Sequence, residues 1–480
     1  MAIEDLLHPF VGRYMDSPGW LKASAGRAYA CLPPRVRLGR AYHRFLDESA
    51  IPGDPCVTAQ LAREKLERTL RWALETVPAY QPHRALLDAR LDPHELLARL
   101  PVTDKLEIKR NPERYLSTAL PPSARLQMFT GGSTPHPMRF YLHKHVSRSK
   151  EYAYIQRFRQ RVGAQPGDLM LALRGRTVPT AAQPGGAIWM VEPIKRQLIL
   201  SSEHLERRFM PAYAEALARH RPAYIEAFAS ALYPLARWLA QNPLPEFTSN
   251  LKGVMLYSEN VYGFQLRKFR EVFGCPIVMH YGHSERVLMA ATLPNDDRYF
   301  FWPQYGHFEL LDVDNRPITK PGVMGFVVGT SFDNHAMPFV RYRTGDLAML
   351  SERGHPDLPG YPVCERILGR LQEFIVCRDH RLVSITALGV AHFPELALVE
   401  AIQYEQEKPG LVTLKVAAES RLRAAMLERI AAAVANKMQG GCDVKVVQVE
   451  RIERTPRGKA RMLIQRLDIR RYFGAPTAGA

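Results

Sequence analysis

The alternation of short apolar runs with longer stretches of helical periodicity most constrains how this chain can fold. Apolar residues recur at helical spacing over Thr58–Val77, before Pro78, and over Phe209–Leu239 with a break near Pro222. Other apolar runs have only four or five residues and are typical of strands: Leu169–Leu173, Gly253–Tyr257, Pro276–Met279 and Gly325–Val328. Strands that alternate with helices predict an α/β architecture rather than an all-α or all-β one.

The C-terminal part of the chain has a different pattern. Its expected elements are, in order, a strand at Leu411–Val416, an Ala-rich helix at Ser420–Met438, a stop at Gly440-Gly441 and an alternating strand at Val444–Val449. This order predicts a small α+β domain. We place its boundary near Leu368–Gln372, which gives a large N-terminal domain over 1–368 and a small C-terminal domain over 369–480. The first ~50 residues carry no assignment.

Composition narrows the class of protein. The chain has 480 residues, 46% of them hydrophobic, and a net charge of +17, which excludes disorder as the main state and favours anionic partners such as nucleotides, coenzymes, nucleic acid or acidic lipid. The six cysteines are far apart and indicate reduced thiols rather than a disulfide framework or a zinc site: Cys31, Cys56, Cys275, Cys364, Cys377 and Cys442.

The sequence predicts no membrane span, because no stretch has the ~20 uninterrupted apolar residues that a spanning helix needs. The first residues, Met1–Pro9, carry acidic residues and a proline where a secretory signal would carry basic residues and an apolar run. We therefore expect a soluble protein of the cytoplasm.

The first motif with chemical potential is the glycine-rich segment Phe129–Pro137. Consecutive Gly, Ser and Thr residues leave backbone N–H groups and hydroxyls free to surround an anion, as phosphate-binding loops do. No Gly-Lys-Ser/Thr follows, so this is not a Walker loop. Taken alone, the segment is more typical of a plain surface turn than of a phosphate-binding loop.

The second motif, His280–Arg286, directly follows the expected strand Pro276–Met279. A sharp glycine turn at a strand end presents polar side chains where α/β proteins bind ligands. Ser284 two residues after Gly282 resembles a nucleophile elbow, but Arg286 stands at the second glycine position, where a side chain would crowd the turn. A plain loop is the other interpretation.

Three further motifs follow. Within Phe339–Leu347, the carboxylate of Asp346 could accept hydrogen bonds from ribose hydroxyls, or could cap a turn. Gly369–Glu373 and Arg454–Ala460 come later, and Lys459 in the last of these could reach a polyanionic site as a point charge, or could simply be solvated.

Together and in this order, the five motifs resemble those of the adenylate-forming superfamily of acyl-CoA synthetases and related adenylation enzymes. They are Thr-Gly-Gly-Ser-Thr-x-x-Pro, Tyr-Gly-x-Ser-Glu, Tyr-Arg-Thr-Gly-Asp, Gly-Arg and Thr-Pro-x-Gly-Lys. The chain is most similar to the phenylacetate–CoA ligase and capsule-biosynthesis subgroup, through Leu100–Lys105, Ser230–Tyr233, Ser258-Glu259 and Asn334–Asp346. The resemblance spans roughly residues 55 to 465.

The resemblance implies a role for each matching residue. Thr130, Gly131, Gly132, Ser133 and Thr134 would form the loop over the β- and γ-phosphates of ATP. Tyr281 would stack on adenine beside Gly282, the Ser284 hydroxyl would contact the α-phosphate, and Glu285 would hold Mg²⁺. Asp346 would bind the ribose hydroxyls with help from Arg370 at the domain junction, and Lys459 would be the adenylation lysine of a mobile C-terminal lid domain.

Three positions depart from the family pattern. Pro135 replaces a glycine and removes one N–H donor from the phosphate loop, and His136 stands where a lysine is frequent. Gln372 replaces the usual acid of the hinge motif. Ser284 replaces a more common threonine but keeps the hydroxyl. Looser loop contact or slower adenylation could follow from Pro135.

These observations predict an AMP-forming ligase. It would activate a carboxylic acid as an acyl-AMP with release of pyrophosphate and then form an acyl- or aryl-CoA thioester, using ATP, Mg²⁺ and coenzyme A. The alternatives are transfer to an amine, an amino sugar or a protein thiol, and a nucleotide-binding protein with impaired catalysis. The presence of Lys459, Asp346 and Glu285 argues against the last of these.

The acid pocket and the partners are less marked. By the resemblance, Phe228, Ser230, Tyr257 and His280 lie near the acid and would suit an aryl or medium-chain substrate, although each could equally be a core residue. No aromatic-interleaved basic stretch or helix-turn-helix pattern occurs, so we expect no nucleic-acid partner. The acid, the acceptor and the oligomeric state stay open.

Overall fold

The computed structural model of this chain describes residues 3–7, 10, 14, 17–50, 54–130, 138–174, 178, 186–202, 204–370, 373–388, 399, 401–418, 420–454 and 460–472. The chain divides into two compact units. The first consists of Met1–Asp168, Glu192–Gln197 and Val278–Ile367, and the second of Leu169–Val191, Leu198–Ile277 and Leu368–Ala480.

The first unit begins with helices: α1 (Ile3–Leu7), α3 (Gly19–Ala30), α4 (Pro34–Arg37), α5 (Ala41–Glu48), α6 (Pro55–Thr76), α7 (Pro93–Ala98), α8 (Lys105–Arg110) and α9 (Ser147–Arg161), with 3₁₀ turns at Gln81–Leu87, Pro112–Tyr115 and Pro122–Ala124. The helix predicted over Thr58–Val77 is confirmed as α6. It begins where the Asp54 carboxylate accepts a hydrogen bond from the Cys56 N–H at 2.8 Å, and it ends just before Pro78.

The strands of the first unit follow the order β12 (Gly306–Leu311), β13 (Met324–Ser331), β14 (Tyr342–Leu350), β15 (Val363–Arg370), β11 (Asp296–Phe301), β10 (Met289–Leu293) and β9 (Ile277–Gly282). The short β1 (Thr103–Asp104) pairs parallel to β14, and β2 (Arg125–Phe129) with β3 (Arg139–His143) forms an antiparallel hairpin. The strands predicted at Pro276–Met279 and Gly325–Val328 are confirmed as β9 and β13.

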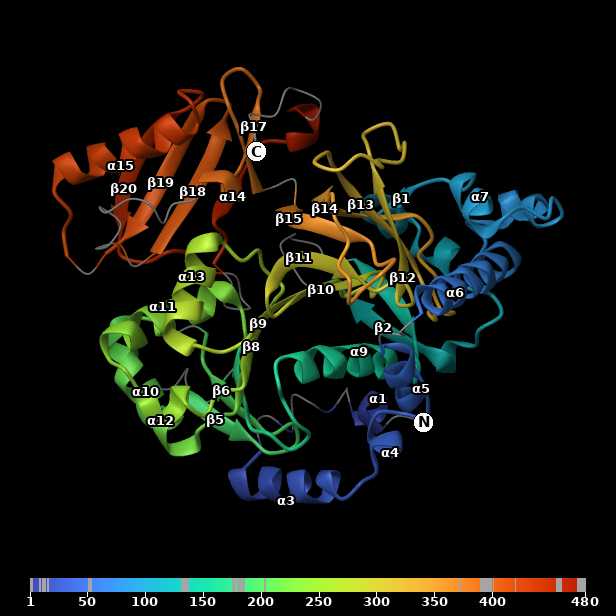
Figure 1. The fold of residues 1–480 in the computed structure, drawn as a ribbon, viewed down its shortest axis with the longest axis horizontal. Coiled ribbons are helices and arrows are strands. Elements are labelled where there is room, and N and C mark those ends of the chain that lie inside the picture. The colour runs from blue at the N-terminus through green and yellow to red at the C-terminus, as the bar shows by residue number, and fades with distance from the viewer. Residues whose placement is uncertain are drawn as a thin grey trace. The chain divides into compact units, whose positions relative to one another are not determined.

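The first ~50 residues, which carry no prediction, pack on this unit through buried charges. Helix α5 lies alongside α9 (Figure 1). The Lys65 ammonium is 2.5 Å from the Glu48 carboxylate and 3.0 Å from the Asp333 carboxylate, and the Lys150 ammonium is 2.9 Å from Asp333. Both lysines are only 3% exposed, so their pairing satisfies charges that would otherwise destabilise the fold.

The second unit contains a parallel strand set, β4 (Met170–Leu173), β7 (Tyr224–Ala227) and β8 (Gly253–Tyr257), continued by β6 (Gln197–Leu200) and β5 (Trp189–Glu192). Its helices here are α10 (Met210–His220), α11 (Ala229–Gln241), α12 (Pro245–Thr248) and α13 (Gly263–Phe273), with a 3₁₀ turn at Arg207–Phe209. The predicted break near Pro222 is confirmed, but it contains strand β7, which the helical pattern did not reveal.

The end of the chain forms a small α+β arrangement within the second unit. Four strands pair in the order β20 (Asp443–Val449), β19 (Leu411–Ala417), β18 (Ala401–Lys408) and β21 (Leu463–Gln465), beside the hairpin β16 (Phe374–Val376) and β17 (Leu382–Ser384), α14 (Ile385–Leu388) and a 3₁₀ turn at Ile469–Tyr472. Helix α15 (Ala424–Lys437) packs on these strands (Figure 1). The predicted fold class is confirmed, and the boundary at 368/369 stays a prediction.

The two units have separate apolar cores. In the first, residues of α6 such as Leu66 and Leu70 pack with Phe140 and Val327, all fully buried. In the second, residues of the small sheet and α15, such as Leu414 and Ile430, form another cluster. Within the described ranges, no helix is long and apolar enough to cross a membrane.

Candidate active site

Two of the predicted motifs meet at the end of strand β9. The Tyr281 hydroxyl donates a hydrogen bond to the Asp346 carboxylate at 2.8 Å, although the two residues are 65 positions apart in sequence. Asp346 lies within β14 and is only 8% exposed. The predicted adenine-stacking and ribose-binding residues therefore lie side by side in the first unit.

His283 completes this group, and the sequence reasoning gave it no role. Its Nε2 is 2.7 Å from the Tyr281 hydroxyl and 3.4 Å from the Asp346 carboxylate. Because the Tyr281 proton goes to Asp346, the imidazole donates its Nε2–H to the tyrosine oxygen. Nδ1 is then the acceptor nitrogen, and it is buried without a hydrogen-bond partner among the described residues. The only sequence signal for His283 was its position inside the motif.

The turn after β9 places the next two predicted residues differently. Ser284 is exposed, whereas the carboxylate of Glu285 is buried and accepts a hydrogen bond from the Tyr342 hydroxyl at 3.1 Å. Tyr342 begins the third motif, so a second contact joins the same two motifs.

Arg286 stands where a nucleophile elbow carries its second glycine. It adopts a left-handed backbone with φ +57°, a conformation that favours glycine. Its guanidinium donates to the Ser147 carbonyl at 2.6 Å. The long side chain is thus accommodated against α9 rather than crowding the turn.

Gly282 and His280 are packed against each other. A Cβ atom at Gly282 would lie 3.1 Å from Cε1 of the His280 ring, so the glycine allows the imidazole to approach the strand. The His280 ring is half-buried, with its centroid 5.4 Å from that of Phe158. His280 is thus partly a packing residue of the first unit.

Thr130 closes the base of the predicted phosphate loop. Its N–H donates to the Met138 carbonyl at 2.9 Å, and its hydroxyl accepts from the Met138 N–H at 2.8 Å. This double contact extends the β2–β3 hairpin by one pair. Gly131, Gly132, Ser133, Thr134, Pro135 and His136 lie outside the described residues.

The predicted residues of the C-terminal region are only partly described. Lys459 and Gln372 lie outside the described residues, and so does the side chain of Arg370. The residues flanking Lys459 are placed: Arg454 pairs with Ala460 as an antiparallel bridge. Residues 455–459 therefore connect two paired positions.

Ser230, in the second unit, supports the start of helix α11. Its hydroxyl donates to one Glu259 carboxylate oxygen and its N–H to the other, both at 2.9 Å. A carboxylate at a helix N-terminus pairs with backbone N–H groups that have no partner within the helix. The Ala460 N–H donates to the Ser230 hydroxyl at 3.3 Å, which links α11 to the end of the lysine-bearing segment.

Arg454, at the other end of that segment, is mostly buried. Burial lowers its pKa, and the carboxylates of Glu259 and Glu206 oppose this shift by favouring the charged form. Glu259 therefore interacts with both ends of the segment 454–460. It binds Ser230, which accepts a hydrogen bond from Ala460, and its negative charge stabilises the charged form of Arg454.

Tyr257 and Phe228 lie with two residues that the sequence reasoning did not single out. Arg174, Phe228 and Tyr257 follow positions that are in register on β4, β7 and β8, so their side chains share one face at the carboxyl ends of these strands. The Arg174 guanidinium is 2.5 Å from the Tyr257 hydroxyl and 2.7 Å from the carboxylate of Glu226, which also accepts from that hydroxyl.

Arg174 and Glu226 add a buried charge pair beside Phe228 and Tyr257, two residues that were predicted to lie near the acid. Glu226 is 0% exposed, and a buried carboxylate requires the positive charge of Arg174 beside it. No motif marks either residue. The carboxyl edge of parallel strands is where α/β proteins bind ligands, so the lining predicted as aromatic also carries an ion pair.

An acid one position after Gln372 is present at the hinge motif. The Asn260 amide donates a hydrogen bond to the Glu373 carboxylate. Gly369 has φ +85°, and a Cβ there would lie 2.2 Å from both of these side chains. Glycine is thus required at this position both by its backbone conformation and by the close approach of the Asn260–Glu373 pair.

The described residues offer little protein ligation for a metal. No group of three or more His, Cys, Asp or Glu side chains in the described ranges could hold an ion. Mg²⁺ in nucleotide sites usually has one or two protein carboxylates and takes its other ligands from phosphates and water. A single buried carboxylate, Glu285, fits that arrangement.

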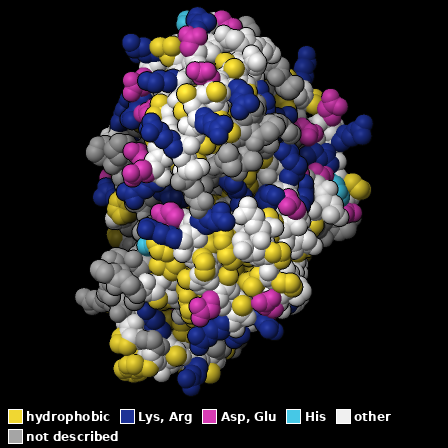
Figure 2. Space-filling view, turned by 90° about the vertical axis from the view of Figure 1, so that its left-hand side faces the viewer, with side chains coloured by type: hydrophobic (Ala, Val, Ile, Leu, Met, Phe, Trp, Pro, Cys, Tyr) yellow, Lys and Arg dark blue, Asp and Glu magenta, His cyan; other side chains and the backbone are white. Residues whose placement is uncertain are grey.

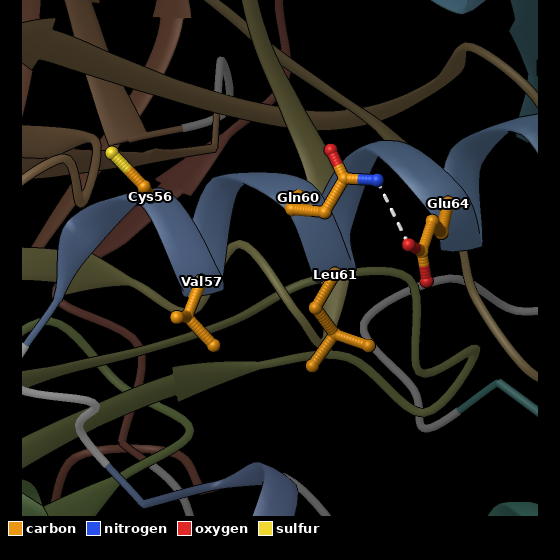
Figure 3. A pocket seen from close by; sticks show the side chains of 5 residues that line it. All are labelled: Cys56, Val57, Gln60, Leu61 and Glu64. Atoms are coloured by element: carbon orange, nitrogen blue, oxygen red, sulfur yellow. Dashed lines mark hydrogen bonds between the residues drawn. The ribbon is translucent and has the colours of Figure 1, made fainter.

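Two hollows of the described surface, one in each unit, do not contain the Tyr281 group. One, of about 430 Å³, is a shallow depression on α6, where Val57 and Leu61 point the same way and the Gln60 amide donates to Glu64 at 2.8 Å (Figure 3). Glu64 is the charged side chain among the residues that line it.

The other hollow, of about 570 Å³, belongs to the second unit. Figure 2 faces the side that carries α10, α11 and α15, and Lys and Arg side chains gather across the middle of that view. Four arginines line the hollow with three glutamates: Arg207, Arg237, Arg451, Arg454, Glu206, Glu450 and Glu453. Its charges are mixed rather than purely basic.

Comparison with known proteins gives one sequence relative. No protein-family model matches the chain. A phenylacetate-coenzyme A ligase of Thermus thermophilus is 24% identical over 358 residues, which cover 72% of this chain and 77% of the relative.

Solved structures agree on the fold. The 2-hydroxyisobutyryl-CoA ligase in its postadenylation state with R3-HIB-AMP has a TM-score of 0.62 and 19% identity, and covers 85% of this chain and 90% of its own. The acyl acid amido synthetase AtGH3.15 in complex with 2,4-DB has a TM-score of 0.56 and 14% identity. This match covers 91% of this chain and 96% of the AtGH3.15 chain. The fold that the resemblance of the five motifs implies is therefore confirmed: this chain has the fold of these two enzymes.

Proposed function

We propose that this protein is an AMP-forming ligase that activates a carboxylic acid with ATP and transfers the acyl group to coenzyme A. The observation that carries the proposal is the contact between the second and third motifs. Tyr281 bonds Asp346, and Tyr342 bonds Glu285, across 65 and 57 positions of sequence. Residues predicted to serve one nucleotide thus come together in the first unit.

The nucleotide would be held mainly by the first unit. Tyr281 would stack on adenine, and Asp346 would accept hydrogen bonds from the ribose hydroxyls. His283 Nδ1 could accept a further bond from the nucleotide. Thr130 anchors the segment whose Gly131, Gly132, Ser133 and Thr134 would surround the phosphates, with the exposed Ser284 hydroxyl directed to the α-phosphate.

Positive charge is the main requirement of the first half-reaction. A carboxylate oxygen of the substrate attacks the α-phosphorus, the bond to the bridging oxygen breaks, and pyrophosphate leaves. Bound Mg²⁺, held by Glu285, would supply positive charge where the phosphate oxygens gain negative charge. Lys459 would supply the second positive charge beside the α-phosphate, with Arg370 near the ribose.

The acyl substrate would lie against the second unit. Phe228 and Tyr257 offer aromatic surface at the carboxyl ends of β7 and β8. The Arg174–Glu226 pair beside them gives this surface a polar end, and Ser230 is held at the start of α11. An aryl or medium-chain acid agrees with such a lining.

The acceptor is the less constrained half of the proposal. The sequence relative is named for coenzyme A, and so is the 2-hydroxyisobutyryl ligase, whereas AtGH3.15 is named as an amido synthetase. We propose coenzyme A as the acceptor. An amine, an amino sugar or a protein thiol is the alternative, and a chain with impaired catalysis is the remaining one.

A screen of carboxylic acids tests both halves. The full chain is incubated with ATP, Mg²⁺ and each acid, and pyrophosphate and AMP are measured with and without coenzyme A. We expect acid-dependent pyrophosphate release, with thioester appearing only when coenzyme A is added. Lys459→Ala protein prepared in the same way reports contaminating activity.

The outcomes separate the alternatives. Stoichiometric ADP would contradict attack at the α-phosphorus. Acyl-AMP that accumulates with coenzyme A but is consumed by hydroxylamine would favour an amine acceptor. Nucleotide binding by calorimetry without turnover of any acid would favour the impaired protein.

A further inference from the structure

Two cysteines that are 65 positions apart in sequence face each other in the second unit. The Cys377 and Cys442 sulfur atoms are 3.8 Å apart, and both residues are buried, at 0% and 2% exposure. The wide spacing of the cysteines gave no reason to expect this pair. Neither residue belongs to the site described above.

Backbone contacts on both sides hold the two thiols together. Cys377 starts the turn between β16 and β17, and Cys442 directly precedes β20. The Arg378 N–H donates to the Gly441 carbonyl at 2.8 Å, and the guanidinium of Arg378 is 2.8 Å from the Asp443 carboxylate. The two turns are thus joined next to each sulfur atom.

Gly441 permits the close approach. A Cβ atom at this position would lie 2.7 Å from the Cys377 sulfur and 2.9 Å from its Cβ. Any side chain there would displace the Cys377 thiol away from Cys442. The backbone of Gly441 therefore packs directly on the Cys377 sulfur, and the next residue, Cys442, carries the second sulfur.

The two thiols are not equivalent. Cys442 donates its S–H to the Cys377 sulfur, which lowers the pKa of Cys377. Arg381 and Arg378 act in the same direction, whereas burial and Asp379 oppose this shift. The same sharing raises the pKa of Cys442. Cys377 is therefore the thiol that ionises first and reacts first with an oxidant.

We propose that Cys377 and Cys442 form a reversible intramolecular disulfide when the protein meets a peroxide. The Cys377 thiolate attacks one oxygen of hydrogen peroxide, giving a sulfenic acid and hydroxide. The Cys442 sulfur then attacks the Cys377 sulfur, its proton and the hydroxyl leave as water, and the S–S bond forms. The hydroxide takes up the proton that Cys377 released on ionising, so two thiols are oxidised and one peroxide is reduced to two waters.

The bond would act on the segment that follows Gly369–Glu373. Strand β16 begins at Phe374, so Cys377 lies in the first turn of the small α+β arrangement. A disulfide would tie that turn covalently to the connection between α15 and β20. Cross-links that close long loops restrict the unfolded chain, so the oxidised form should resist unfolding better than the reduced one.

The test uses the full chain with the exposed thiols of Cys31 and Cys56 replaced by serine. After peroxide treatment, free thiols are counted under denaturing conditions and a non-reduced digest is analysed by mass spectrometry. We expect two of the four remaining thiols to be lost, and the peptides of Cys377 and Cys442 to be joined. A reductant should restore both thiols.

Two comparisons keep the proposal falsifiable. Cys364 is fully buried but has no neighbouring thiol in the described chain. Its loss therefore measures how fast peroxide oxidises a buried thiol that has no second thiol beside it. In Cys442→Ser protein, the sulfenic acid on Cys377 should accumulate and be trapped by a dimedone reagent. Free Cys377 and Cys442 after peroxide, or loss of Cys364 at the same rate, would overturn the proposal.

Discussion

In the first unit, the candidate site residues contact one another, motif to motif: Tyr281 bonds Asp346, and Tyr342 bonds Glu285. In the second unit, Tyr257 bonds Arg174 and Glu226, which no motif contains, whereas Ser230 bonds Glu259 of the Ser258-Glu259 stretch. The predicted nucleotide-binding residues of the first unit are thus joined within the motifs. The predicted acid-binding residues also contact side chains that no sequence pattern marked.

The largest effect that we expect concerns the buried ion pair of the second unit. Glu226→Ala leaves the Arg174 guanidinium without its buried partner, which should lower the free energy of unfolding by about 3–5 kcal/mol. Urea denaturation measures this. Glu259→Ala, which removes a more exposed carboxylate of the same unit, is the matched comparison and should cost less. Equal losses would mean that the pair has no special importance.

Lys459→Ala should reduce acyl-AMP formation by about 10²–10³-fold, because its charge acts on negative charge that develops in the transition state. Conversion of supplied acyl-AMP and acceptor to product should be much less affected. Lys445→Ala, which removes an exposed lysine of β20, is the control and should leave both rates unchanged. Equal damage to both halves would argue against an adenylation-specific role.

Asp346→Ala tests the motif contact of the first unit. Loss of a hydrogen bond to a charged group typically costs about 1.5–3 kcal/mol, so ATP affinity measured by calorimetry should fall by about 10- to 150-fold. Tyr281→Phe removes only the hydroxyl that bonds Asp346 and keeps the ring for adenine, so it tests this hydrogen bond separately from the carboxylate. Unchanged affinity in folded Asp346→Ala would exclude the ribose role.

Acid should affect the first unit before the second. Burial lowers the pKa of His307, on β12, to about 4, with His94 and Arg341 acting in the same direction. Between pH 6.5 and 4 the unfolded chain binds a proton here that the folded unit excludes, so stability falls as the pH decreases, by about 1–2 kcal/mol at pH 5. Hydrogen exchange should show β12–β14 losing protection before β18–β20. His307→Gln should flatten this dependence.

The smallest effect is expected from Pro135→Gly. The change restores an N–H donor and backbone freedom to the segment anchored by Thr130, so adenylation measured by pyrophosphate release should be equal or slightly faster. A large loss of rate in folded protein would show that the proline is a required part of this loop.

Periodicity predicted the long elements well, because α6, α15, β8 and β19 each bury a regular face. It missed β7, because a four-residue strand between two helices is too short to show its own period. It also gave nothing for the first ~50 residues, where the short α5 buries Tyr42 and Phe45 and the Glu48 carboxylate pairs with the buried Lys65.

The residues of the candidate site could be predicted where they belong to a motif. Asp346, Tyr281 and Glu285 were found through motifs. Arg174, Glu226 and His283 were not, because a buried charge or a second hydrogen bond depends on which distant strands lie side by side. The meeting of Cys377 with Cys442 has the same cause.

The double hydrogen bond between Thr130 and Met138 has a practical consequence for engineering. Because the β2–β3 hairpin is closed on itself at this pair, the seven residues between them form an exchangeable cassette whose ends are already fixed. Replacing 131–137 with sequences of equal length should leave the strands in register. Libraries built in this segment could therefore test its proposed contact with the phosphates of ATP without changing the strands on either side.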